Sequence, residues 1–309
     1  MNPGGTPAYD RRPAAVVPMP ARPPRHWPDG AGVWVCPVIA LDTPEDPVPE
    51  GWPQPDAPWV AGVPQPRPEI GCAGVRGYGP RRGFFRLAGA LKALRLPYAL
   101  AIDVLTAETH PDLVQSCLQG EWGDAEWVAH GLSWSRPLHA AVDEALERAY
   151  LLETRERLAA CGIRTDTWLG IQRGQSPRTP ALLAQAGYRI CLDGCDDEQP
   201  RPWALPDTPA PLWSLPQMAD LDDAHALCAP SGLTPRAYAR RIVEAAAALA
   251  DEGREQARTL AFTLRPYISG QPFRVDALLD AFVQLSLLPG VRLATPAQIV
   301  AGWQQAAQG

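Results

Sequence analysis

The sequence predicts an α/β protein whose single domain is a (β/α) barrel of seven to eight parallel strands. Runs of apolar, β-branched or aromatic residues alternate with stretches of helical periodicity along most of the chain. Because each expected strand is followed by a helical pattern, the strands should be parallel. The length of 309 residues suits one such unit, since α/β barrels commonly reach about 200–250 residues as one domain. A doubly wound open sheet is the alternative.

Eight segments have the composition of buried strands. They are short, apolar and bounded by turn-forming residues. In chain order they cover 33–41, 98–103, 126–130, 167–171, 188–193, 211–215, 259–264 and 291–295.

Seven segments between or after these strands have helical patterns. Several begin with Ser or Thr before a proline, as in Ser176-Pro177, Thr234-Pro235 and Thr295-Pro296, and this order is typical of a helix start. The expected helices cover 83–95, 111–119, 138–161, 177–186, 235–253, 275–288 and 296–305.

Two segments lack a regular period. Residues 1–24 carry Arg and Pro, which predicts an extended N-terminal arm before a barrel domain at 25–309. Residues 43–82 form a Pro-rich insertion with neither helical nor strand period, too long for an ordinary connection. The insertion is therefore expected to be a functional loop, an oligomer contact or a disordered segment, and its position directly after the first strand would let it cover the barrel mouth.

Composition excludes several classes of protein. A net charge of −6 argues against a nucleic-acid binder, which would carry a basic face. No apolar run reaches the roughly 18 residues of a membrane span. The seven cysteines are scattered through mostly apolar runs, which suits free thiols in a reducing compartment. We therefore expect a cytoplasmic protein without membrane or nucleic-acid partners.

Polar residues follow the expected strands at the point where each strand ends. Because the carboxyl ends of barrel strands share one face, where active sites of such barrels lie, these residues are expected to meet there. They are Asp42, Asp103, His130, Asp193, Arg265 and Thr295.

A series of motifs resembles the polysaccharide deacetylase-like superfamily of the NodB-homology type. The closer resemblance is to the branch that includes the metal-independent, PuuE-type allantoinases. The motifs span residues 25–303 in the family's order and include RHWPDGA at 25–31, YGPRRGFFR at 78–86, His130-Gly131, Trp168-Leu169-Gly170, Asp196-Asp197 with Pro200, and Arg265-Pro266 with Gly270-Gln271-Pro272.

The resemblance implies a distorted (β/α) barrel that hydrolyses a carbon–nitrogen bond of an N-acyl group or a cyclic amide. Such chemistry requires an activated water, a group that stabilises the oxyanion and a proton donor for the departing nitrogen. Asp42 stands where the family has an acidic or amide residue, which makes it the candidate general base or the residue that orients one. Glu45, three positions later, is a candidate substrate contact.

On this resemblance His130 is the leading candidate for a functional residue, as an electrophile or proton shuttle. In the metal-dependent relatives a second histidine follows four residues later, where this chain has Trp134. A lone imidazole with distant carboxylates is a poor transition-metal site. We therefore expect no cofactor and no tightly bound zinc, and at most a weakly held divalent metal. Trp134 becomes a candidate for stacking on the substrate.

Three other positions complete the candidate site. Asp196 and Asp197 match the family's acidic pair after the fifth strand, and carboxyls brought together in a dry site raise each other's pKa, so one could donate a proton. Arg82 stands at the start of an expected helix, where it could bind an anion. Arg265 replaces the family's histidine.

Arginine cannot act as a general acid or base near neutral pH. Arg265 therefore leaves three interpretations open: the substrate carries an anionic group, the proton transfer has moved to His130, or catalysis has been lost. The predicted function is a metal-independent hydrolase of small N-acyl or ureide-type compounds. The alternative is a relative that keeps the barrel and binds a small ligand without turnover. A homo-oligomer is compatible with the resemblance.

Overall fold

A parallel barrel forms the centre of the computed structural model, which describes residues 17–52, 70–203, 205, 208, 210–228 and 232–307. Within these residues one sheet has the strand order β6-β7-β5-β4-β3-β2-β1-β8, with β9 paired to β1. All strand pairs are parallel except β6 with β7. The strands are β1 Val33–Leu41, β2 Tyr98–Ile102, β3 Ala125–Ala129, β4 Thr167–Trp168, β5 Ile190–Cys191, β6 Arg201–Trp203, β7 Leu212–Ser214, β8 Arg258–Leu264 and β9 Val291–Leu293.

The barrel closes between β7 and β8. Gln217, three residues after β7, forms a parallel bridge with Ala261 of β8, and the Met218 N–H donates to the Ala261 carbonyl over 2.8 Å. The closed barrel is therefore confirmed over the open sheet. Strand β6, which the sequence did not predict, lies outside this closure as an antiparallel partner of β7.

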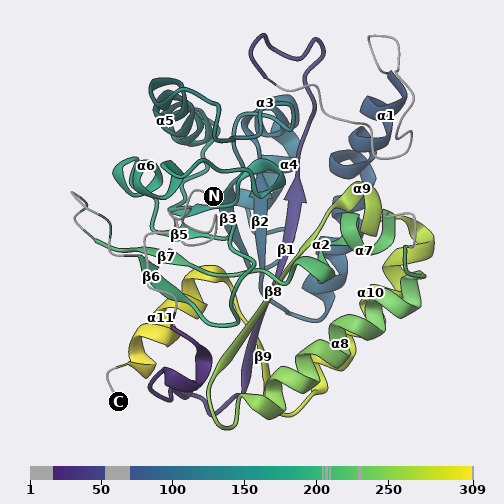
Figure 1. Cartoon of the computed structure of the whole chain (residues 1–309). Coiled ribbons are helices and arrows are strands. Elements are labelled where there is room, and N and C mark those ends of the chain that lie inside the picture. Colours follow the sequence, from purple (N-terminus) through teal and green to yellow (C-terminus); the bar gives the residue numbers. More distant parts are fainter. Residues whose placement is uncertain are drawn as a thin grey trace, which may run out of the picture.

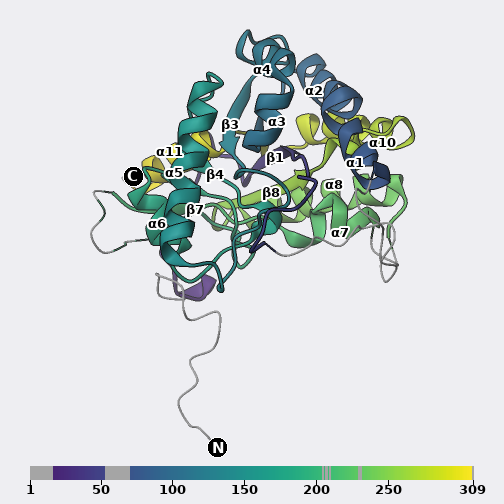
Figure 2. The same ribbon diagram turned by 90° about the horizontal axis from the view of Figure 1, so that it is seen from above.

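Helices surround the strands. Viewed from above, α5 and α6 lie on one side of the strands and α8 and α10 on the other (Figure 2). The helices are α1 Ile70–Tyr78, α2 Phe84–Ala93, α3 Val104–Thr109, α4 Pro111–Leu118, α5 Glu144–Ala160, α6 Thr179–Gln185, α7 Asp223–Cys228, α8 Pro235–Glu252, α9 Pro266–Ser269, α10 Pro272–Leu287 and α11 Pro296–Ala306.

The helix starts that the sequence marked most clearly lie where expected. The Thr234 side chain accepts from the Ala237 N–H at the start of α8, and Thr295 forms a capping box with Gln298 at the start of α11. Helix α5 is shorter than predicted, because Asp143 rather than an earlier residue caps its first turn.

The largest correction concerns residues 43–82, for which no helix was expected. Helix α1 occupies Ile70–Tyr78 and continues through a π-helical turn, Gly79–Gly83, into α2. Residues 53–69 of the insertion, and residues 1–16 of the predicted arm, lie outside the described residues. Short helices α3, α7 and α9 were also not predicted.

The core has an outer layer between barrel and helices and an inner layer inside the barrel. Strand β1, which crosses the middle of Figure 1, is buried over all nine residues, as expected for a strand covered on both faces. Alternate residues of β1 join different layers: Val33, Val35 and Ile39 pack against the helices, and Cys36 and Val38 face the interior.

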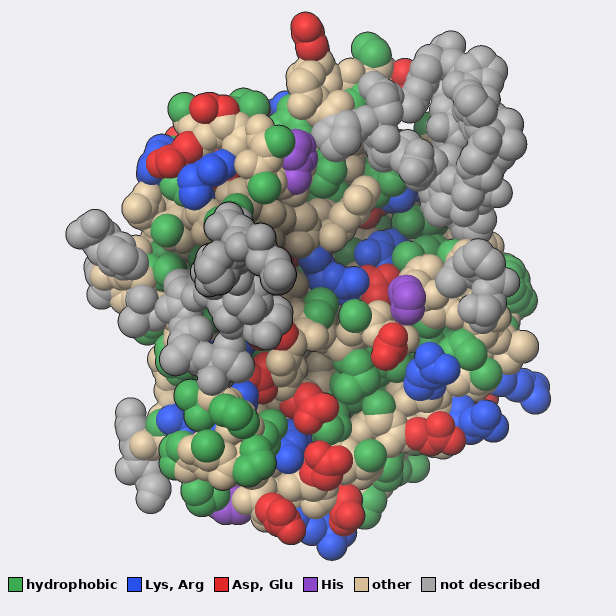
Figure 3. All heavy atoms as spheres, viewed as in Figure 1, with side chains coloured by type: hydrophobic (Ala, Val, Ile, Leu, Met, Phe, Trp, Pro, Cys, Tyr) green, Lys and Arg blue, Asp and Glu red, His purple; other side chains and the backbone are tan. Residues whose placement is uncertain are grey.

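The surface in Figure 3 has basic and acidic side chains interspersed over α8 and α10 rather than a basic stripe. No described helix is long and apolar enough to cross a membrane.

Candidate active site

Asp42 and His130 meet at the carboxyl end of the barrel. Asp42 follows β1, His130 follows β3, and β2 lies between these strands. The Asp42 Oδ2 and His130 Nε2 atoms are 4.0 Å apart. The two side chains are 3% and 6% exposed, so their charges interact in a medium that screens them weakly. The structure thus brings together the two residues that the strand ends marked.

The hydrogen bonding of His130 fixes its tautomer. Its Nδ1 lies 2.6 Å from the Leu169 carbonyl oxygen, and a carbonyl can only accept, so Nδ1 carries the proton. Burial lowers the pKa of His130; the nearby Asp42 opposes this shift, whereas Arg265 and Arg76 add to it. The neutral ring therefore presents the lone pair of Nε2 towards Asp42, as a proton acceptor does.

Gly131 allows the chain to turn directly after His130. Its φ is +79°, and a Cβ built there would lie 2.1 Å from the Tyr150 hydroxyl. That hydroxyl accepts from the Leu132 N–H over 3.1 Å. The glycine thus lets the backbone pass close to Tyr150.

Arg76, which sequence reasoning missed, completes the centre of the site. It comes from α1 and donates through Nη1 to Asp42 Oδ1. Its guanidinium carbon lies 3.6 Å from the ring centroid of Trp134 and 4.7 Å from that of Tyr267, as in cation–π contacts. Among the described residues no acceptor lies within hydrogen-bond distance of its Nε, although the side chain is only 4% exposed.

Trp134 was predicted to stack on substrate. Its ring instead lies on Arg76, and its backbone N–H donates to the Thr43 carbonyl over 3.0 Å. Trp134 therefore supports Arg76 in the site. The face of its ring that Arg76 covers cannot stack on a substrate.

Arg265 also lies near His130 but is held by two carboxylates. Its Nη1 and Nη2 donate to the two oxygens of Asp222 over 2.5 and 3.1 Å, and Nη1 also donates to Asp223 over 3.0 Å. Burial opposes ionisation of Asp222, but Arg265 and Arg173 hold its pKa below the usual value. Burial raises the pKa of Asp223, which also accepts from the Ser269 hydroxyl. The acidic pair at the start of α7 was not predicted.

Asp193, two residues after β5, is buried close to the same end of the barrel. It accepts from the Gly170 N–H over 2.6 Å and from the Cys191 thiol over 3.5 Å. Burial raises its pKa to about 6. Asp103 has a local role instead, because it caps α3 through the Thr106 N–H and also accepts from the Thr43 N–H.

Asp196 and Asp197 do not join Asp42 and His130. Asp197 accepts two hydrogen bonds from Arg22 of the arm, at 2.8 and 2.7 Å, and Asp196 accepts from Arg201 over 2.6 Å. Glu198, which follows Asp197, accepts a hydrogen bond through its backbone carbonyl from the N–H of Thr259, near the start of β8. Arg265 follows the other end of that strand, about 20 Å away at roughly 3.3 Å per residue.

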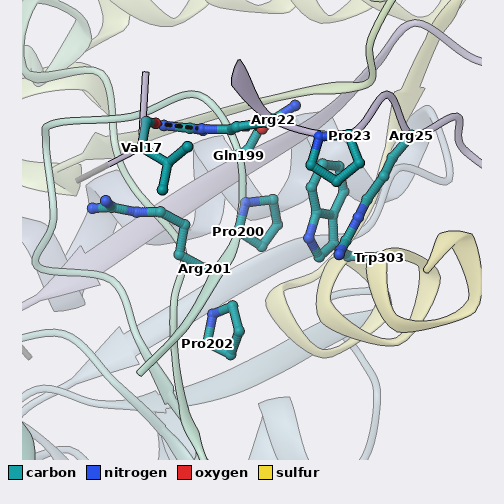
Figure 4. A pocket seen from close by; sticks show the side chains of 9 residues that line it. All are labelled: Val17, Arg22, Pro23, Arg25, Gln199, Pro200, Arg201, Pro202 and Trp303. Atoms are coloured by element: carbon teal, nitrogen blue, oxygen red, sulfur yellow. Dashed lines mark hydrogen bonds between the residues drawn. The ribbon is translucent and has the colours of Figure 1, made fainter. Parts of the chain in front are cut away.

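Arg22 and Arg201 also line a pocket of about 340 Å³ near this amino end of β8 (Figure 4). Its other walls include Pro23, Pro200 and Trp303. The guanidinium of Arg25 lies over the Trp303 ring, 5.2 Å from the ring centroid. The predicted acidic pair thus fastens the arm to the barrel beside this pocket.

The two remaining predicted contacts lie apart from the Asp42–His130 pair. Glu45 accepts from Arg136 over 2.7 and 2.5 Å and from the Ser133 hydroxyl over 2.6 Å; burial opposes ionisation, but these bonds hold the pKa of Glu45 below its usual value. Arg82 is exposed. Because the π-helical turn is continuous with α2, no free helix N-terminus stands beside Arg82 to bind an anion.

The described residues do not fit a tightly held metal ion. Among them, no three His, Cys, Asp or Glu side chains gather closely enough to coordinate one. Asp42 and His130 provide two ligands, and the Arg76 cation already occupies one oxygen of Asp42. A catalytic zinc site requires three protein ligands. The absence of a bound metal stays a prediction.

Comparisons with known proteins agree with the fold. Neither a family model nor a curated protein matches the sequence. Among solved structures, PuuE allantoinase superposes with a TM-score of 0.83 and 22% identity, over 95% of this chain and 97% of that one. The fold is that of PuuE allantoinase.

Two polysaccharide deacetylase structures share this allantoinase-like fold. A putative enzyme from Mycobacterium smegmatis has a TM-score of 0.75 and 25% identity over 91% of this chain and 93% of that one. A probable polysaccharide deacetylase from Pseudomonas aeruginosa PAO1 has a TM-score of 0.80 and 21% identity over 92% of this chain and 95% of that one. The distorted barrel that the sequence motifs implied is confirmed.

Proposed function

We propose that the protein hydrolyses a carbon–nitrogen bond of a small N-acyl or ureide-type compound, without a metal, at the Asp42–His130 pair. The observation that carries the proposal is the state of His130. Its Nδ1 proton is committed to Leu169, and its Nε2 faces a carboxylate 4.0 Å away. A neutral imidazole beside a carboxylate suits proton transfer at neutral pH.

The two residues divide the proton transfers between them. A water that enters between them loses a proton to His130 Nε2 while its oxygen adds to the carbonyl carbon. Asp42 stabilises the resulting imidazolium. The tetrahedral intermediate then collapses, the carbon–nitrogen bond breaks, and His130 returns the proton to the departing nitrogen.

The test measures product from the full chain with a panel of ureides and N-acyl amino sugars. Release of ammonia, amine or carboxylate is expected from the wild type, with turnover about 10²–10⁴-fold lower in His130→Ala and Asp42→Asn. His225→Ala is the matched control, because the His225 side chain is 65% exposed. Unchanged turnover in His130→Ala would overturn the assignment. Stoichiometric zinc in active protein would overturn metal independence.

A second candidate function is ligand binding without turnover. Two ion pairs favour it, Asp42 with Arg76 and Asp222 with Arg265. In both pairs the carboxylate and the arginine bind each other, so neither is free to act on a substrate. In that case compounds from the panel raise the melting temperature of the protein, yet no product appears at any enzyme concentration.

We further propose a cytoplasmic protein whose partner is a small-molecule substrate, not nucleic acid or membrane. The net charge of −6 supports the exclusion of nucleic acid. A homo-oligomer is proposed as well; light scattering coupled to size-exclusion chromatography tests it, and a monomeric mass at working concentration contradicts it.

A further inference from the structure

Helix α1 contains three glycines that its geometry does not require. Gly71, Gly74 and Gly77 have no positive φ, and a Cβ at any of them would meet nothing within 4 Å. In a helix each glycine lowers the helical equilibrium about fivefold relative to alanine, so three lower it roughly a hundredfold. Helix α1 is also the amino-terminal end of a helical run that continues through the π-helical turn into α2, and hydrogen bonds at the end of a helix open most easily. Helix α1 therefore depends on contacts made elsewhere.

The end of α1 nearest α2 is firmly held, in contrast. In the π-helical turn that follows, a Cβ at Gly83 would lie 2.0 Å from the Pro266 carbonyl oxygen, and Gly79 packs against Tyr267. Among the α1 side chains whose burial is described, Arg76 is the fully buried one, and it inserts between Trp134 and Tyr267, while Val75 packs partly buried against the core. The helix thus has a fixed carboxyl end and a glycine-rich body that is held mainly through Arg76.

The same anchor closes the site. The residues around it are almost inaccessible: counted over backbone and side chain together, Asp42, His130, Trp134 and Tyr267 are each less than 8% exposed. A substrate can reach the Asp42–His130 pair only after a neighbouring element moves. Arg76 is the side chain that lies directly on Asp42, and the helix that carries it is glycine-rich.

Arg76 also has donors to offer a substrate. Its Nη1 binds Asp42, whereas its buried Nε has no acceptor. A guanidinium has five N–H donors and stays protonated. When water adds to a carbonyl, negative charge develops on the carbonyl oxygen, and a fixed cation with a free N–H beside it stabilises that charge.

We infer that Arg76 binds the oxyanion of the reaction and that α1 is a lid that carries Arg76 into and out of the site. This rests on the proposed function. In the closed state His130 holds the proton taken from water, Arg76 donates to the oxygen anion, and collapse of the intermediate returns the proton from His130 to the nitrogen. Asp42 already balances the positive charge of Arg76, so Arg76 has no unmatched charge to attract an anionic substrate. The carbonyl that it binds therefore belongs to an uncharged amide or ureide.

Hydrogen exchange tests the lid without a substrate. We expect the amides of 70–78 to exchange faster than those of α2 in the wild type. The triple variant Gly71→Ala, Gly74→Ala, Gly77→Ala should slow them up to about a hundredfold. The matched control is Gly89→Ala in α2, where a Cβ also meets nothing within 4 Å; it should leave exchange at 70–78 unchanged. Exchange at 70–78 as slow as in α2, or unaltered by the triple variant, overturns the lid.

Kinetics test the role of Arg76 on a substrate found in the panel. Arg76→Met should lower kcat about 10²–10³-fold, with partial recovery on adding methylguanidinium; a merely structural role would not give that recovery. The triple alanine variant should lower kcat because the lid opens less often. Wild-type kcat in Arg76→Met overturns the oxyanion role while hydrolysis itself stands. A wild type that hydrolyses nothing overturns the proposed function and this role together, and hydrogen exchange then decides the lid alone.

Discussion

Replacing Asp193 by asparagine should flatten the pH dependence of stability. Burial raises the pKa of this carboxyl from 3.8 to about 6. Between these values the folded chain holds a proton that the unfolded chain has released. The stabilisation is therefore complete below about pH 3.8 and is lost as the pH rises through about 6. At about 1.4 kcal/mol per pH unit, the difference amounts to about 3 kcal/mol.

Asparagine cannot titrate, yet it is nearly the same size and keeps an oxygen for the Gly170 N–H. From pH 4 to pH 7.5, the free energy of unfolding of Asp193→Asn should therefore fall about 3 kcal/mol less than that of the wild type. Urea unfolding followed by tryptophan fluorescence at each pH measures this, since the chain has 11 tryptophans. Asp280→Asn on the exposed side of α10 is the control and should parallel the wild type. Parallel curves for Asp193→Asn would refute the reasoning.

Three further substitutions test packing and the arm. Gly131→Ala should cost at least 2 kcal/mol or so, because the added Cβ meets the Tyr150 hydroxyl at 2.1 Å and φ is +79°; a melting temperature equal to that of the wild type would contradict this. Arg22→Ala should cost about 1.5–3 kcal/mol in urea unfolding, because Asp197, whose side chain is 2% exposed, loses the two hydrogen bonds from Arg22 and keeps Arg201 at 3.2 Å; a neutral result would mean that the arm contributes nothing to stability. Phe262→Ala should cost about 3–5 kcal/mol by opening a cavity at a fully buried ring, and a loss below 1 kcal/mol would show that the core collapses around it.

The barrel could be predicted because its elements obey local rules. The uninterrupted apolar run of β1 and the Thr-Pro starts of α8 and α11 specify their structures independently of the rest of the chain. Helix α1 gives the opposite signal: with Gly71, Gly74 and Gly77 in nine residues its composition favours a loop. Its helical form depends on the contacts of Arg76 across the barrel mouth, which no local pattern encodes.

The same distinction explains the predicted site. Asp42 and His130 follow strands, so parallel pairing alone brings them to one edge. Asp196 and Asp197 matched a family motif in order, but after Asp193 the chain runs back to the amino end of β8, as the bond between Glu198 and Thr259 records. The order of a motif along the sequence therefore does not tell at which end of the barrel its side chains lie.

Arg265 shows how contacts narrow the interpretations that a residue type leaves open. An arginine that anchors an anionic substrate needs unmatched charge, yet Arg265 faces two oxygens of Asp222 and one of Asp223. A substrate carboxylate would have to displace carboxylates already in place, beside a third at Asp42. The site therefore disfavours an anionic group at Arg265, and the choice lies between proton transfer through His130 and loss of catalysis. Because His130 is neutral and its Nε2 faces Asp42, the geometry needed for that transfer is intact.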